Sequence, residues 1–445
     1  MARKSTTTPS AQPTTPAAAG AIAGRPVVIV GGVRIPFARS NTVYTRVGNL
    51  DMLSAALQGT IERFALDGVK IDEVMAGAVT SHSRDWNLAR EAVLSTTLSP
   101  LTPATTIQQA CGTSLQAALL LGAKIASGQI ECAIAAGSDT TSDAPIVFGQ
   151  KFATRLLDLN RARTFGQRLA AFKGFRLGEL KPVGPQNAEP RTGLSMGQHC
   201  ERMAREWNIE RRAQDELALA SHQNAHQAWE SGFFDDLVVP FADLTRDNNI
   251  RADSTLDKLG SLRTVFDRGP NGTLTAANST PLTDGAAAVL LASEEWAAKH
   301  QLPVLARLTH GRVAAVDFVH DEGLLMAPTV AVAEMLFAAG LTLQDFDFYE
   351  IHEAFAAQAL CTLKAWNDER YCRERLGLDS VLGEIDRDKL NVKGGSVAIG
   401  HPFAATGARI ISTLAKLLAN KGQGRGLISI CTAGGMGVTA ILERS

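Results

Sequence analysis

Short apolar runs alternate with longer helical stretches along most of the chain. The strand-like runs are "PVVIVGGVRIPFA" from Pro26, "VMAGAVT", "ECAIAAGSD", "AAAVLLAS", "FDFYEIHEAF" and "GLISICTAGGMGVTAILE". Runs of this kind are typical of buried strands, and the periodic segments between them are typical of helices. Strands separated by helices of a dozen or more residues predict parallel βαβ units in a layered α/β core.

A faint internal repeat relates two distant parts of the chain. In the first part, Cys111 and Gly112 open an Ala/Leu-rich helix that ends at Gly128, and the strand "ECAIAAGSD" follows. In the second part, "GHP" opens the helix "FAATGARIISTLAKLLANKG", with Pro402 as its first residue, and the strand "GLISICTAGG" follows. The repeat predicts two copies of one layered unit packed together.

A region of different character lies between these parts. Residues 145–190 are basic and apolar, with Asp158 and Glu179 as the only acidic side chains from Lys151 to Lys181. Two helices are predicted next, from Met196 to Trp207 and within "ERRAQDELALASHQNAHQAWESG". The second carries an apolar stripe and a terminating glycine, namely Ala213, Leu217, Ala220, Ala228 and Gly232. We interpret this region as an excursion inserted into the core fold.

The N-terminus differs again, because "MARKSTTTPSAQPTTPAAAGAIAG" is low in complexity and poor in residues that form a core. The first acidic residue of the chain is Asp51. We predict a disordered tail over residues 1–25, and a transit peptide is the alternative interpretation.

The charge balance and the cysteine content argue against several classes of function. The 445 residues include 44 Lys and Arg against 45 Asp and Glu, so no global field recruits nucleic acid. The six cysteines form no CxxC pair and no spacing with histidine that suggests zinc, so no metal is expected. Without a recognisable secretory signal or a membrane-length apolar run, the sequence predicts a soluble protein of the reducing cytoplasm.

Four residues whose side chains could take part in catalysis stand at the ends of predicted helices or strands. Cys111 lies at a helix start, where free N–H groups and the helix dipole favour a thiolate, so we interpret it as a nucleophile. His401 precedes the second central helix, while His352 and Cys431 follow apolar strands. Reactive residues gathered at strand ends beside glycines form a site more often than they occur by accident.

The motifs ACG, HEAFA, GHPFAATGAR and CTAGGMG, with "AANSTPLTDGAAAVLL" between them, closely resemble the thiolase family from Pro26 to Ser445. The HEAF form, where many thiolases carry Asn-Glu-Ala-Phe, resembles the branch that includes the β-subunits of fatty-acid β-oxidation complexes. The resemblance implies a duplicated α-β-α-β-α fold with an inserted loop domain. The implied division is an N-terminal core over 26–141 and 280–302, a loop domain on the coenzyme A side over 142–279, and a C-terminal core over 303–445.

The resemblance also implies an activity, the cleavage of 3-oxoacyl-CoA by coenzyme A to acyl-CoA and acetyl-CoA through an acyl-Cys111 intermediate. A thiolate can attack the keto carbon and leave again, and an imidazole such as His401 is suited to take its proton. Cys431 would protonate the departing acetyl-CoA enolate. Coenzyme A enters as a substrate, and no cofactor is implied.

Further residues receive roles by the same resemblance. His401 and His352 would line one oxyanion hole, and the backbone N–H groups of Cys111 and Ala433 would form another. Because the charge of His352 can change, the pH profile is expected to differ from that of the Asn forms. Glu353 is expected to support a catalytic partner. Coenzyme A and acyl contacts are expected from Thr280, Arg251 and Met326.

The sequence leaves partners and rival functions open. The resemblance implies a homodimer or homotetramer, and the HEAF form suggests a hydratase/dehydrogenase α-subunit. The basic stretch has three interpretations: a funnel for coenzyme A phosphates, a patch for a partner or for peripheral membrane contact, and a solvated helical face. The rivals to a degradative thiolase are a biosynthetic acetoacetyl-CoA thiolase, a ketoacyl-synthase-type condensing enzyme and a non-catalytic acyl-CoA-binding scaffold.

Overall fold

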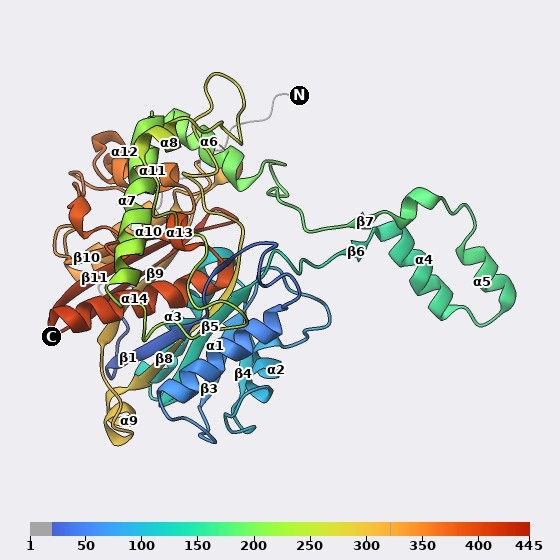
Figure 1. The fold of residues 1–445 in the computed structure, drawn as a ribbon, viewed down its shortest axis with the longest axis horizontal. Helices are drawn as coiled ribbons and strands as arrows, with labels where there is room; N and C mark the ends of the chain where they lie inside the picture. The colour runs from blue at the N-terminus through green and yellow to red at the C-terminus, as the bar shows by residue number, and fades with distance from the viewer. Residues whose placement is uncertain (1–19, 321) are drawn as a thin grey trace, which may run out of the picture.

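The computed structural model describes residues 20–320 and 322–445, and its centre is one large mixed sheet (Figure 1). The ten strands follow the order β10-β11-β12-β9-β1-β8-β5-β3-β4, with β2 paired to β8. Their bounds are β1 Val27–Arg34, β2 Ala38–Arg39, β3 Glu73–Gly77, β4 Ala104–Thr106, β5 Cys132–Asp139, β8 Thr283–Ser293, β9 Ala306–Ala315, β10 Phe348–Ile351, β11 Gly424–Thr432 and β12 Met436–Arg444. The predicted α/β layered architecture is confirmed.

The sheet divides into two halves that repeat the same path. In the first half β1, β8, β5 and β3 are neighbours, and in the second half β9, β12, β11 and β10 follow the same order. The halves join where β1 pairs with β9. The central helices α3, Thr113–Ala126, and α14, Thr406–Lys421, pack against each other between the halves.

The two faces of the sheet bury different helices. Along β1, Val27 and Ile29 join the core that contains α3 and α14, whereas Val28 and Val30 join the core under α1 (Asn49–Arg63). This follows from the alternation of side chains along a strand. The remaining helices are α2 Leu88–Leu94, α6 Met196–Glu206, α7 Arg211–Glu230, α8 Leu256–Gly260, α9 Glu294–Lys299, α10 Ala327–Ala339, α11 Ala356–Trp366, α12 Glu369–Glu374 and α13 Ser396–Ile399.

The expectation of parallel units is only partly right. Strand β3 is parallel to β4 and β5, and β10 is parallel to β11. The pairs β1–β8, β5–β8, β11–β12 and β12–β9 are antiparallel. The cause in the second half is a tight turn at Gly434 and Gly435, whose φ angles of 77° and 71° favour glycine and reverse the chain directly into β12.

The predicted N-terminal tail extends too far along the chain. Residues 1–19 lie outside the described residues, but residues 20–25 contact the core. Ala21 forms a bridge to His310 in β9, and Arg25 donates to the carbonyl of Ile125 and pairs with Glu131 at 2.7 Å. This short segment is ordered because its backbone and guanidinium groups find partners on neighbouring elements and because Ile22 packs against the core.

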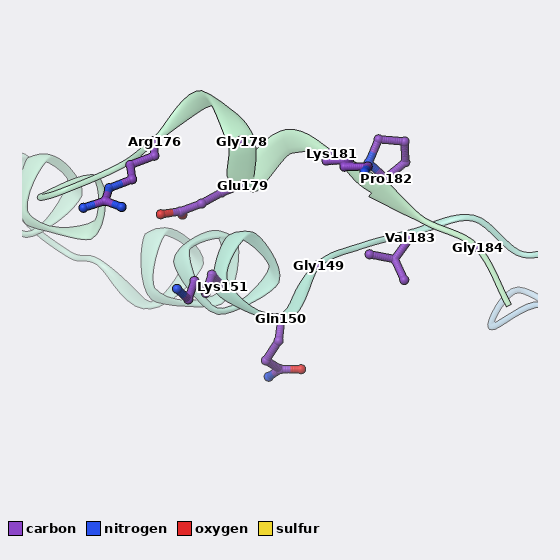
Figure 2. Close-up of a pocket in the computed structure, with 10 residues that line it drawn as sticks. All are labelled: Gly149, Gln150, Lys151, Arg176, Gly178, Glu179, Lys181, Pro182, Val183 and Gly184. Carbon is purple, nitrogen blue, oxygen red and sulfur yellow. The ribbon is translucent and has the colours of Figure 1, made fainter. Parts of the chain in front are cut away.

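The excursion contains a long arm, residues 146–188, that projects away from the body (Figure 1). It consists of β6 (Val147–Phe148), α4 (Gln150–Arg161), α5 (Phe165–Ala171), a 3₁₀ turn (Leu177–Leu180) and β7 (Pro182–Val183). Figure 2 shows a hollow between α4 and the returning segment, lined by Lys151, Arg176, Lys181 and Glu179. All residues from 141 to 196 are described, and none of them is buried.

Two local expectations about helices are wrong. Helix α7 was expected to bury Ala213, Leu217, Ala220 and Ala228, but Ala220 is exposed and the buried face includes Gln214, Asp215, Ser221 and His222. Pro402 does not begin a helix, because a 3₁₀ turn over Phe403–Ala405 precedes α14. The Asp139 carboxylate accepts from the backbone N–H of Ala404 at 2.8 Å and holds that turn.

Candidate active site

Cys111 and His401 meet between the two halves of the fold. Cys111 lies in a 3₁₀ turn over Ala110–Gly112 directly before α3, and His401 lies just before the turn that leads into α14. Nε2 of His401 is 3.1 Å from the Cys111 sulfur, and both side chains are buried. Nδ1 of His401 contacts the Thr406 hydroxyl at 2.6 Å, which fixes the ring. This geometry allows direct proton transfer from sulfur to imidazole.

Burial favours the neutral forms of Cys111 and His401 in the free site, against the effect of the helix terminus on the thiol. Burial raises the pKa of Cys111 to about 12, although backbone N–H groups of Ala433 and Cys111 itself oppose that rise. Burial, together with the Arg409 cation, lowers the pKa of His401 to about 3. Desolvation therefore outweighs the helix-terminus effect. The thiolate must form as His401 takes the proton during the reaction.

His352 completes this cluster from the end of β10. Its ring centroid is 4.1 Å from that of His401, and ligand atoms of Cys111, His352 and His401 lie within 4.8 Å of one another. Nδ1 of His352 contacts the Ser396 hydroxyl at 2.8 Å, whereas the buried Nε2 has no hydrogen-bond partner among the described residues. An unpartnered ring nitrogen in a buried site is available to a substrate oxygen.

The charge of His352 is not expected to change near neutral pH, contrary to the expectation from its residue type. Burial lowers its pKa well below the usual value, and His401 and Arg409 act in the same direction. The residue is therefore a neutral imidazole over the working range of most enzymes.

Cys431 is the last residue but one of β11. It is buried in an apolar cluster with Met326 and Phe355. Burial raises the pKa of Cys431 well above its usual value, and the interaction with Cys111 adds to the rise. Cys111 therefore acts electrostatically on Cys431, and a common site for the two sulfurs stays a prediction.

The backbone of the loop after Cys431 also faces Cys111. The N–H groups of Ala433 and of Cys111 itself act as hydrogen-bond donors toward the Cys111 sulfur. An oxyanion formed on a carbon bonded to that sulfur would lie near the same donors. The neighbouring Gly434 N–H donates to the Glu189 carboxylate at 3.0 Å, so the end of the excursion holds this loop.

Glu353 links three segments beneath the site. Its carboxylate accepts from Ser221 of α7 at 2.8 Å, from the Asn391 side chain at 2.6 Å and from the Val397 N–H at 3.2 Å. A Cβ on Gly395 would lie 2.2 Å from this carboxylate, so glycine is required there. These contacts are those of a residue that orients the His352 loop.

The three residues that were expected near coenzyme A or the acyl group differ in what they contact. Thr280 donates through its N–H and its hydroxyl to the carbonyl of Ala354, two residues after His352. Met326 is buried in the apolar cluster with Cys431. Arg251 is exposed, and its backbone N–H donates to Nδ1 of His222 in α7.

Sequence reasoning missed a group of supporting residues. Thr406 and Ser396 hold the two imidazoles, and Arg409 donates to Ser396 at 3.0 Å. Asp139 accepts from Val79, Thr80 and Ala404, and thereby joins the two halves. Thr406 and Arg409 stand within the GHPFAATGAR motif, which was the available signal, but the others show nothing distinctive in the sequence.

A buried cysteine beside an imidazole, with backbone donors at the same sulfur, is the arrangement of enzymes that use a cysteine as a covalent nucleophile. Family models described as "Thiolase, N-terminal domain" and "Thiolase, C-terminal domain" match residues 27–295 and 302–444. The chain therefore belongs to the thiolase family.

Individual relatives agree with this assignment. The chain is 43% identical over 426 residues to the 3-ketoacyl-CoA thiolases of Yersinia enterocolitica (serotype O:8 / biotype 1B) and Yersinia pestis (strain Pestoides F), covering 94% of this chain and 97% of each relative. Among solved structures, Bacillus anthracis acetyl-CoA acetyltransferase matches with a TM-score of 0.78 and 31% identity over 95% of this chain and 99% of its own. Human mitochondrial 3-ketoacyl-CoA thiolase in complex with CoA matches with a TM-score of 0.79 and 27% identity over 97% and 100%.

Within the part of the chain that the structure describes, no helix has the length and apolar character required to span a membrane.

Proposed function

We propose that this chain is a degradative 3-oxoacyl-CoA thiolase in which Cys111 carries the acyl group. His401 takes the thiol proton, and the sulfur attacks the keto carbon of the substrate. The N–H groups of Cys111 and Ala433 hold the resulting oxyanion. The carbon–carbon bond then breaks, and its electron pair passes into the acetyl-CoA enolate, which His401 and His352 stabilise.

Cys431 supplies the second proton of the cycle. Its thiol protonates the enolate carbon, so acetyl-CoA leaves and Cys431 becomes a thiolate. The thiol of coenzyme A gives its proton to Cys431 and attacks the Cys111 thioester. Cys111 leaves as a thiolate that recovers its proton from His401, and acyl-CoA is released. Protons balance over the cycle, and no cofactor takes part in it.

The observation that carries this proposal is the 3.1 Å contact between Cys111 and His401 beside the unpartnered Nε2 of His352. The test is acylation of Cys111 by a 3-oxoacyl-CoA, located by mass spectrometry, in the wild type and in Cys111→Ala. The control is Cys372→Ala, which removes a buried cysteine of α12 outside the site. Binding of acyl-CoA without acylation would support the scaffold function instead.

The biosynthetic direction is the second candidate, because the similar B. anthracis protein is an acetyl-CoA acetyltransferase. Rates of thiolysis for acyl chains from four to sixteen carbons separate the two functions. We expect activity on long chains, whereas activity confined to the four-carbon substrate would favour the biosynthetic function. A ketoacyl-synthase-type enzyme would retain its activity without Cys431.

We further propose that the chain is a cytoplasmic homo-oligomer that assembles with a hydratase/dehydrogenase subunit, as the β-subunits of β-oxidation complexes do. The HEAF form supports this branch, and the six free cysteines agree with a reducing compartment. Co-purification of the full-length chain with such a subunit from its own cells tests the proposal. A chain that migrates alone and has full long-chain activity would contradict it.

The position of the arm favours the interpretation as a patch for peripheral membrane contact over that as a coenzyme A funnel. The arm projects away from the body that holds Cys111 (Figure 1). Between Lys151 and Lys181 it carries eight basic and two acidic residues, and Phe165, Leu169 and Leu177 are 75%, 61% and 79% exposed. Basic residues interleaved with exposed apolar ones suit an anionic lipid surface.

Sedimentation with vesicles of phosphatidylcholine and phosphatidylglycerol tests this contact. We expect binding that Arg168→Glu weakens and that salt reduces, whereas a change of the exposed Arg212 of α7, Arg212→Glu, leaves it unchanged. Equal sedimentation of wild type and Arg168→Glu would exclude lipid as the partner of the arm and favour a protein partner.

A further inference from the structure

A chain of buried polar side chains lies behind His352, on the side away from Cys111. It begins at Ser396, the first residue of α13, continues to Arg409 of α14 and ends at Glu350 of β10. Ser396 and His352 are fully buried, and Arg409 and Glu350 are 2% and 1% exposed. Placing a guanidinium inside a protein is costly, so its contacts call for an explanation.

The ion pair alone does not explain this arrangement. Nη1 of Arg409 is 4.0 Å from the Glu350 carboxylate, which is beyond hydrogen-bond distance. Burial raises the pKa of Glu350 to about 8, with Arg409 opposing the rise. Nη2 of Arg409 donates to the Ser396 hydroxyl at 3.0 Å, the one hydrogen bond of this guanidinium within the described chain.

Only one hydrogen-bond acceptor among these side chains is then left for the hydroxyl proton of Ser396. A guanidinium only donates, so the Ser396 oxygen must accept from Arg409. The other side-chain contact of Ser396 among the described residues is Nδ1 of His352, at 2.8 Å. If Nδ1 carried a proton, the hydroxyl proton of Ser396 would be buried without an acceptor, which costs free energy. All groups are satisfied when Ser396 donates to an unprotonated Nδ1.

We propose that Ser396, held by Arg409, locks His352 in the tautomer that carries its proton on Nε2. Ser396 and Arg409 are thus positioning residues that turn His352 into a neutral donor for the acetyl-CoA enolate oxygen. Nε2 is the ring nitrogen that has no partner within the described chain, and it belongs to the cluster with Cys111 and His401. This inference deepens the proposed function and rests on it.

The arrangement gives the two imidazoles opposite roles. Thr406 faces Nδ1 of His401, and Nε2 of that ring must be free of a proton to receive one from Cys111. In His352 the protonated nitrogen faces the site instead. Besides each other, the charged or titratable groups that act on these rings are Arg409 and, for His401, the Cys111 thiol. Arg409 in turn interacts with Glu350, Glu353, Arg34 and Asp247. Tautomer choice, rather than net charge, therefore separates the donor from the base.

The kinetic test compares two reactions in Ser396→Ala. Exchange of labelled coenzyme A into acyl-CoA uses Cys111 but forms no enolate, whereas thiolysis and deuterium exchange at the acetyl-CoA methyl group require the enolate. We expect enolate-dependent rates to fall about tenfold or more and acyl exchange to stay within about twofold. Ser396→Thr, which retains the hydroxyl, should recover most of the loss.

Ser412→Ala is the matched control, because Ser412 is a buried serine of α14 whose hydroxyl donates to the Ala408 carbonyl. We expect it to leave both reactions unchanged. An equal fall of both reactions in Ser396→Ala would assign Ser396 a merely structural role and overturn the inference. Absence of Cys111 acylation in the wild type would instead refute the proposed function.

Nitrogen NMR of histidine-labelled protein tests the tautomer directly, with His352→Asn identifying the resonances of His352. We expect a protonated Nε2 and an unprotonated Nδ1 in the wild type, and a mixture of tautomers in Ser396→Ala. A wild-type His352 that carries its proton on Nδ1 would overturn the inference, whatever the kinetic result.

Discussion

The first and second halves of the chain form the same arrangement of strands and helices, but they carry different residues at the ends of corresponding strands. In each half a central helix is followed by a strand, β5 after α3 and β11 after α14. The first of these strands ends at Asp139, which binds backbone N–H groups, and the second carries Cys431 near its end. At this position the first half therefore carries a residue that holds the backbone, and the second half carries a residue with a proposed catalytic role.

The same contrast holds one strand further out. His352, a buried imidazole that belongs to the cluster, directly follows β10, while β3 ends at Gly77. A Cβ on Gly77 would lie 1.7 Å from the carbonyl oxygen of Ile107 in the segment that leads to Cys111. At the end of β3 the first half thus has a glycine that lets two backbone segments approach each other closely. The second half supplies three of the four reactive side chains, and the first half supplies the nucleophile.

Removal of the nucleophile should give the largest effect. We expect Cys111→Ala to lower kcat/KM for thiolysis by about 10⁴-fold or more, because no thioester can form. Steady-state assays with a 3-oxoacyl-CoA and coenzyme A measure the change. If the variant kept substantial activity, the first half would not carry the nucleophile.

Cys431→Ala should have the next largest effect and a more selective one. We expect thiolysis to fall by about 10²-fold or more, since the enolate loses its proton donor, while the wild-type extent of Cys111 acylation by an acyl-CoA persists. Mass spectrometry and the thiolysis assay measure the two quantities. A variant within a few fold of the wild type in thiolysis would refute the mechanism with two thiols.

Asp139→Asn tests the supporting half. Asparagine cannot accept on both sides, so Ala404 loses its acceptor, and we expect thiolysis to fall by about tenfold and unfolding free energy by about 1–3 kcal/mol. Burial raises the pKa of Asp139 to about 6, above the value of about 3.9 for an unfolded aspartate.

The pH dependence of Asp139→Asn follows from this shift. The raised pKa gives a stability contribution that is complete below about pH 4 and is lost as pH rises through about 6. The stability difference between wild type and variant should therefore widen as pH falls from 7 to 4, as urea unfolding can measure. A difference independent of pH would show that Asp139 is not a titrating group in this range.

The smallest effect is expected in the arm, which has no counterpart in the second half. We predict that Phe165→Ser and Leu169→Ser together leave thiolysis of a soluble short-chain substrate within about twofold, because neither residue is buried. The same assay checks this prediction. A large loss of activity would mean that the arm supports the site directly.

Sequence patterns predicted the elements of the core well, because strand ends and glycine-rich turns leave local signals. His352 and Cys431 both follow apolar runs that form β10 and β11. The antiparallel return of β12 was also visible in principle, because Gly434 and Gly435 form a hairpin signal inside what was taken as one run.

The supporting contacts were not predictable, because they join residues that are distant in the chain. Asp139 meets Ala404, and His352 meets Ser396, only after the halves pack. An arginine in a helix normally predicts an exposed position, so the burial of Arg409 was not expected although it stands within the GHPFAATGAR motif. The neutral state of Cys111 likewise depends on desolvation, which a sequence does not display.

The division of labour across the interface of α3 and α14 has a practical consequence. A chain cut in the connection between β8 and β9 would leave the sulfur of Cys111 on one fragment and both imidazoles on the other. Neither fragment alone holds a nucleophile and its base. Regained turnover on mixing the fragments would therefore serve as a direct signal of reassembly.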